Sequence, residues 1–195
     1  MESHAADENF RKRFSEIVNT HSGKRSELFS LAEKARMAGA LNAAADMYLY
    51  LNAKSELGMI AHDAFMCGEY ELSVFIVGNL ANPIDMAELA RDLERVHQWH
   101  HAGNLWRMLG DDPLLFKFAR RAFSSAVNRE VRVREGVDIQ AFREALAMFI
   151  VSGQEDSEQW ARLTYFTMCQ QLQQNIARDI ISYVAAQFGA MLEDA

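Results

Sequence analysis

The sequence of 195 residues has little proline, little cysteine and no long apolar run, and each shortage excludes a class of protein. Cys67 and Cys169 stand alone without CxxC spacing, so neither a disulfide framework nor a thiolate zinc site is indicated. The apolar stretches fall short of the roughly 20 residues of a membrane helix, and the first residues lack the apolar core of a secretory signal. We therefore expect a soluble protein of the cytoplasm without membrane contact.

The charge balance and the missing motifs argue against nucleotide chemistry. There are 20 Lys and Arg against 27 Asp and Glu, and the net charge of −7 works against generic binding to nucleic-acid phosphates. The sequence contains no GxxxxGK[ST] phosphate loop, no GxGxxG turn and no GxSxG elbow. We expect no enzymatic activity and no cofactor, and binding to nucleic acid is disfavoured.

Apolar residues recur at three- and four-residue spacing along most of the chain, which is typical of α-helices. The two prolines, Pro83 and Pro113, stand at expected turns or helix starts. The pattern therefore predicts an all-α fold. The expected helices cover residues 10–18, 26–38, 40–52, 55–67, 70–80, 86–109 as one helix or two, 114–128, 138–150, and 157–188 as one helix or a broken pair, with a connector at 129–136.

Glycines at the turns between paired helices indicate a repeat. Gly39, Gly68, Gly110 and Gly153 follow one another at spacings of 29, 42 and 43 residues. Self-similarity at this scale is typical of stacked helical hairpins, in which neighbouring hairpins share one core. The expected organisation is an N-terminal helix and linker in 1–24, helical hairpins in 25–128, and a C-terminal hairpin with a capping helix in 129–195.

Small residues stand seven positions before three of these turn glycines, where the two helices of a hairpin have to approach closely. They are Ala32, Ala61 and Gly103. The pattern predicts a right-handed stack of antiparallel hairpins, with an irregular helical bundle as the alternative architecture.

Two segments of the chain resemble the tetratricopeptide repeat, a helical hairpin of about 34 residues. The matching residues of the first are Ala61, Ala64, Gly68-Glu69-Tyr70-Glu71 and Asn82-Pro83, and those of the second are Trp99, Ala102-Gly103, Trp106 and Gly110. The resemblance covers residues 25–128, and the chain departs from the family in the spacing of its turns.

The resemblance implies a protein-binding adaptor or chaperone that captures a partner peptide or helix in a groove lined by the first helix of each hairpin. Aromatic, Met and Arg side chains are typical of interface anchors. Mapped by position, the predicted partner-binding residues are Phe29, Arg36, Met37, His62, Phe65, Met66, His97, His100, Asn104 and Arg107. The alternative interpretation of Phe29, Phe65 and Met66 is that they belong to the core.

A metal-binding protein or enzyme is one alternative function, because Glu94, His97 and His101 form the sharpest local cluster. On a single helix, His97 and His101 are one turn apart, and Glu94 comes three residues earlier. Two imidazoles and a carboxylate are able to hold one metal ion. The HExxH order of a metalloprotease is absent, so the main prediction assigns no metal.

A regulator that binds nucleic acid is the other alternative function, and it rests on a basic strip. The strip consists of Lys117, Arg120, Arg121, Arg129, Arg132 and Arg134. Glu130 and Glu135 interrupt the strip, and the neighbouring phenylalanines are expected in the core, which favours a solvated face.

The last expected helix carries an apolar stripe that is wide for the partner of one hairpin. The stripe includes Trp160, Leu163, Phe166 and Met168. The helix is expected to cap the array or to pair with a second copy of the chain, so a homodimer through this helix is a hypothesis.

Overall fold

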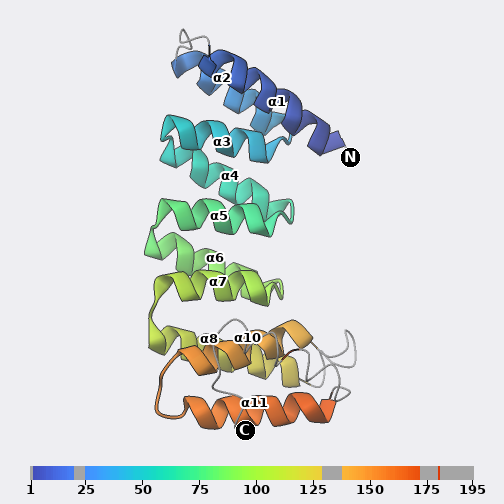
Figure 1. The fold of residues 1–195 in the computed structure, drawn as a ribbon, viewed down its shortest axis with the longest axis vertical. Helices are drawn as coiled ribbons and strands as arrows, with labels where there is room; N and C mark the ends of the chain where they lie inside the picture. Colours follow the sequence, from blue (N-terminus) through green and yellow to red (C-terminus); the bar gives the residue numbers. More distant parts are fainter. Residues whose placement is uncertain (1, 20–24, 129–137, 172–179, 181–195) are drawn as a thin grey trace. The chain divides into compact units, whose positions relative to one another are not determined.

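The computed structural model describes residues 2–19, 25–128, 138–171 and 180, with side chains from residue 5 onward, and these residues form helices joined by turns (Figure 1). The predicted all-α class is confirmed for this part of the chain. The helices are α1 Glu2–Asn19, α2 Arg25–Met37, α3 Leu41–Leu51, α4 Lys54–Met66, α5 Tyr70–Leu80, α6 Pro83–Arg95, α7 Trp99–Leu109, α8 Asp112–Val127, α10 Ile139–Val151 and α11 Ser157–Gln171. None of these helices is long and apolar enough to cross a membrane.

The chain divides into two compact units, Met1–Asn82 and Pro83–Ala195. In the first unit, α1 packs against α2 and α3, and each later helix packs against the one before it, as far as α5. In the second unit, α6 packs against α7 and α7 against α8, while α10 packs against α7, α8 and α11. The connector predicted at 129–136 and most of the last helix beyond Gln171 lie outside the described residues.

The hairpins follow a constant register of 29 residues. A long helix of 13 residues starts at residues 25, 54 and 83, and a short helix of 11 residues starts at residues 41, 70 and 99. Helix α8 starts at residue 112, again 29 positions after the start of α6. Both helix lengths therefore recur without insertion or deletion through three hairpins.

A left-handed residue closes the turn inside each hairpin. Gly39, Gly68 and His97 occupy the equivalent position with φ of 73°, 80° and 60°. Each turn is a Schellman motif, in which the next backbone N–H donates to a carbonyl five residues earlier. The N···O distances are 2.9 Å from Ala40 to Ala35, 2.8 Å from Glu69 to Ala64, and 2.8 Å from Gln98 to Leu93.

This register corrects the expected role of Gly110. From its spacing of 42 residues after Gly68, Gly110 was predicted to be the turn of the third hairpin. In the structure this turn is at His97, between helix α6, which ends at Arg95, and helix α7, which begins at Trp99. Gly110 instead ends α7 with φ 64°, equivalent to Asn52 and Ala81, which end α3 and α5 with φ 53°. These three residues lie in the connections between hairpins, again 29 positions apart.

Alanines fill the positions where close helix packing requires a small side chain. Ala32, Ala61 and Ala90 stand seven residues before the left-handed residue of each hairpin, and all three are buried. The predicted small residue is therefore confirmed for the first two hairpins. In the third hairpin Ala90 takes this place, and Gly103 lies in α7 instead. A large apolar residue four positions before each alanine, such as Leu28 or Leu57, is also buried.

Two aspartates cap helix starts in the second unit. Asp111 caps α8 by accepting a hydrogen bond from the backbone N–H of Leu114 at 3.0 Å. Pro113 follows in the first turn, where a missing N–H costs nothing. Asp138 caps α10 in the same way, accepting from the N–H of Ala141 at 2.9 Å.

Substitution of His97 by glycine tests the turn assignment. A left-handed conformation costs a residue with a Cβ atom about 1 kcal/mol relative to glycine, so we expect His97→Gly to raise the free energy of unfolding by about that amount. Chemical denaturation of the full chain measures the change. His97→Ala is the matched control, since it removes the imidazole but keeps the Cβ atom, and it should give no gain. Equal stability of the two variants would contradict the assignment.

Candidate functional site

In the first unit, an ionic network fixes the long helices α2 and α4 to each other. The guanidinium of Arg36 donates to Asp63 Oδ2 of α4 at 2.9 Å and to Glu33 Oε1 of its own helix at 2.9 Å. The hydroxyl of Tyr48 on α3 donates to the other oxygen of Glu33 at 3.0 Å. Arg36, one of the predicted partner-binding residues, is therefore half-buried and held in place by carboxylates of the same unit.

The protonation states of this network follow from its contacts. Hydrogen bonds to Glu33 and Asp63 raise the pKa of Arg36, while the hydrogen bonds from Arg36 and Tyr48 lower the pKa of Glu33. Burial, reinforced by the neighbouring Glu33 carboxylate, raises the pKa of Tyr48 to about 12. Arg36 and Glu33 are thus charged and Tyr48 is neutral at neutral pH, so the network is a permanent feature of this face.

Around the network, α2 and α4 expose methionine side chains. Met37 is 75% exposed and Met66 is 69% exposed, at equivalent positions of the two hairpins. Met59, His62 and Met66 have i, i+3, i+7 spacing, lie on one side of α4 and are all exposed. We call Met37, Met59, His62 and Met66 the methionine face. The interpretation of Met66 as a core residue is wrong.

The two predicted phenylalanines of this unit are half-buried rather than free on the surface. The ring of Phe29 meets Tyr48 edge to face at a centroid distance of 5.7 Å. The ring of Phe65 meets Tyr70 in the same way at 5.7 Å. Both rings therefore border the surface of the long helices and also support the short helices behind them.

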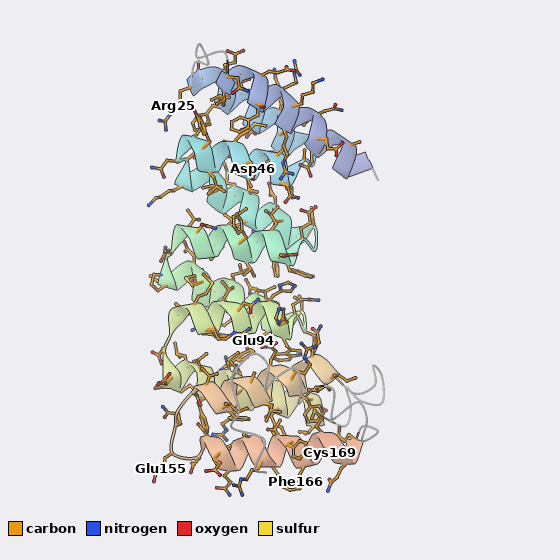
Figure 2. The ribbon with its side chains drawn as sticks, viewed as in Figure 1. Arg25, Asp46, Glu94, Glu155, Phe166 and Cys169 are labelled. Carbon is orange, nitrogen blue, oxygen red and sulfur yellow. The ribbon has the colours of Figure 1, made fainter. Side chains whose placement is uncertain are left out.

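In the second unit, the bridge between successive long helices recurs with its charges exchanged. Arg121 of α8 donates two hydrogen bonds to Glu94 of α6, at 2.7 Å and 2.8 Å. The indole N–H of Trp106 on α7 donates to the same carboxylate at 2.8 Å (Glu94 is labelled in Figure 2). The separation of 27 residues equals that of Arg36 and Asp63, so both pairs occupy the same two positions of the repeat.

The predicted metal cluster does not assemble on one helix. Glu94 belongs to α6, His97 lies in the left-handed turn and His101 belongs to α7. His97 packs its ring against Trp99 at 5.9 Å, and it is exposed. Within the part of the chain that the structure describes, no three His, Cys, Asp or Glu side chains are placed to hold a metal ion. The expectation of one helical face carrying the three residues is wrong, because the turn separates them.

The other residues predicted from α7 gather around a glutamate of α10. His100 Nδ1 lies 2.9 Å from Glu144 Oε1, and Arg107 Nη2 lies 3.9 Å from Glu144 Oε2. Asn104 accepts a hydrogen bond from Arg107 and is also near His100. The Glu144 side chain is only 6% exposed. His100, Asn104 and Arg107 thus share one side of α7 and serve the contact between α7 and α10.

Gly103 makes room for this buried carboxylate. A Cβ atom added at Gly103 would lie 2.6 Å from Glu144 Oε2, far inside normal contact distance. Glu144 is not predictable from local sequence, because it lies 44 residues from His100. The one local signal for this contact is Gly103, because a glycine inside a helix often marks a place where another part of the chain packs closely against the helix.

The described part of the basic strip lies on α8. Lys117, Arg120 and Arg121 are exposed there, and the guanidinium of Arg120 lies 5.0 Å from the ring centre of Trp160. Arg129, Arg132 and Arg134 lie outside the described residues. A continuous strip from Arg120 to Arg134 is therefore not part of the surface described here.

Comparison of the chain with protein-family models, with curated proteins and with solved structures yields no match. The surfaces of the two units therefore have to be interpreted from their own chemistry.

A double-mutant cycle at Gly103 and Glu144 tests the packing of α10 on α7. In the parent chain, we expect Gly103→Ala to lower the free energy of unfolding by about 1 kcal/mol or more, because overpacking outweighs the gain in helix propensity. In a Glu144→Ala background, the same substitution should raise it by about 1 kcal/mol, because only the propensity gain remains. Chemical denaturation measures both changes, and the same sign in both backgrounds would contradict the assigned contact.

Proposed function

We propose that this chain is a non-enzymatic protein-binding scaffold, an adaptor or chaperone, that captures an apolar segment of a partner protein on the methionine face of α2 and α4. The observation that supports it is the exposure of Met37 and Met66 at the same position of two successive hairpins. Surface methionines are flexible and polarisable, so they adapt to apolar side chains of varied shape.

The ionic network gives this surface a fixed base. Because Arg36 joins Glu33 to Asp63, the two long helices cannot slide past each other without breaking charged hydrogen bonds. A preorganised surface loses little conformational entropy when a partner binds. Gly58, which has no heavy atom within 4 Å of the place where its Cβ atom would be, leaves open space on α4. An amphipathic helix with apolar residues at i, i+3 and i+7 fits a surface of this kind.

The relation to the tetratricopeptide repeat is part of the proposal. Buried Ala32 and Ala61 at the helix crossing and the Gly68-Glu69-Tyr70 turn support a hairpin of that type. The 29-residue register differs from the family's length of about 34 residues, so the proposed relation is to a shortened hairpin. The proposed binding surface remains on the first helix of each hairpin, as the resemblance implies.

The proposed methionine face is confined to the first unit because the residues predicted from α7 and from the turn before it have internal partners. His100, Asn104 and Arg107 surround Glu144, and His97 closes a turn. Substitution of these residues would change the packing of the second unit. A variant that lost binding to a partner would therefore not show that the substituted residue contacts the partner.

Selection of binding peptides from a displayed library tests the methionine face. We expect the full chain to select segments with apolar residues at helical spacing, and Met37→Ser with Met66→Ser to weaken their binding about tenfold, since each methionine loses apolar contact area. Met108→Ser is the matched control, because Met108 is 56% exposed on the second unit.

Fluorescence anisotropy of one selected peptide measures the affinities, and circular dichroism checks that the variants fold. Equal binding by the double variant and the parent would refute the proposed surface. An equal loss in the Met108→Ser control would also refute it, because the effect would then not depend on α2 and α4.

We also propose that α11 mediates pairing with a second copy of the chain. Trp160 packs inward on Phe149 and Met168 is buried, whereas Leu163 and Phe166 remain exposed (Phe166 is labelled in Figure 2). Multi-angle light scattering should give a mass that rises toward twice that of the chain with concentration, and Leu163→Ser with Phe166→Ser should keep the mass monomeric. A monomeric mass of the parent at high concentration would refute this contact.

A further inference from the structure

We propose that the second unit binds an acidic segment of a partner protein on the face formed by α6 and α8, through Arg91, Lys117 and Arg120. This inference deepens the proposed protein-binding role and rests on it. It concerns a different surface and a different partner chemistry from the methionine face, so the two are separable by experiment.

The surface consists of two open depressions that share Arg121. One depression is lined by Arg91, Glu94, Arg95, Trp99 and Arg121. The other is lined by Lys117, Arg120, Arg121 and Ser124. Because Arg121 borders both, they form one continuous surface with five basic side chains. We call it the cationic face.

Two of the five cations are already neutralised within the unit. Arg121 donates two hydrogen bonds to Glu94, and its guanidinium also lies 5.8 Å from the ring centre of Trp106. Arg95 pairs with Asp92 one turn earlier on α6. Arg121 therefore joins α8 to α6, and both arginines offer less charge to a ligand than an unpaired cation.

The other three cations have no carboxylate partner among the described residues. Among the residues that the structure describes, Arg91, Lys117 and Arg120 form no ion pair, and all three are exposed. The ring of Trp160 lies 5.0 Å from the guanidinium of Arg120, which orients this side chain without neutralising its charge. The net charge of the chain is −7, so three cations around two depressions, unpaired within the described part of the chain, are a concentration of the opposite charge.

The surroundings of the cationic face favour carboxylates over nucleic acid. Single-stranded nucleic acid typically stacks its bases on exposed aromatic rings. Trp99, which lines one depression, is buried, and the half-buried ring of Trp160 is already stacked on Phe149. The carboxylates of Asp92 and Glu94 also stand among the cations, which interrupts the row of positive charge that a phosphate backbone follows. Separate cations with a serine hydroxyl beside them suit the spaced side chains of an acidic peptide, each carboxylate accepting from one guanidinium or ammonium group.

Binding of a labelled peptide of alternating Glu and Ala to the full chain tests this proposal by fluorescence anisotropy at low ionic strength. We expect saturable binding that weakens with added salt, and a loss of about tenfold in Arg91→Gln with Lys117→Gln. The matched control is Lys34→Gln with Lys54→Gln, which removes the same charge from exposed lysines of the first unit and should retain binding.

Three outcomes would overturn the proposal: no binding of the acidic peptide, an equal loss in the lysine control, or displacement of the peptide by a DNA oligonucleotide that binds more tightly. The last outcome would assign the face to nucleic acid. The variant Met37→Ser with Met66→Ser separates this proposal from the methionine face, since it should still bind the acidic peptide. Failure of the acidic peptide with retained binding of the selected apolar peptides would leave the proposed function in place.

Discussion

The constant 29-residue register depends on one backbone constraint, the left-handed residue that closes each hairpin. At Gly39, Gly68 and His97 the chain leaves the long helix, and the Schellman hydrogen bonds satisfy its last carbonyl groups. Because this turn fixes where the short helix begins, it also fixes which residues face the crossing. The buried alanines at Ala32 and Ala61 occupy that crossing as a consequence of the turn.

The same register explains why two ion pairs with opposite order of charges occupy the same two positions of the repeat. Arg36 reaches Asp63 in the first unit and Glu94 reaches Arg121 in the second, each joining two successive long helices. The backbone sets the distance between the two side chains, and an ion pair forms across this distance whichever of the two positions carries the arginine. The surroundings of the two pairs differ: exposed methionines lie near Arg36 and Asp63, and cations that form no ion pair with any described residue lie near Glu94 and Arg121.

Local sequence predicted the all-α class and the turns at Gly39, Gly68 and Gly153, since apolar spacing and glycine both act over a few residues. The turn of the third hairpin was misplaced because His97 replaces glycine there, so the next visible glycine, Gly110, was taken for the turn. The Arg36 and Glu94 ion pairs and the position of Glu144 were not predicted. These contacts join residues 27 or 44 positions apart, and the first two become visible in the sequence only when the correct period is known.

The docking of α10 determines which predicted binding residues remain available to a partner. In the second unit α10 packs against α7 and buries Glu144, and His100 and Arg107 are the cationic or polar groups nearest its carboxylate, at 2.9 Å and 3.9 Å. In the first unit the predicted polar residue Arg36 lies on a long helix, where it pairs with Glu33 and Asp63, and Met37 and Met66 remain exposed. From residue type alone, the residues of the first unit and those around α7 were both predicted to be interface anchors. The difference between them arises from the neighbouring helix, because a side chain that satisfies a buried charge is not free to bind a partner.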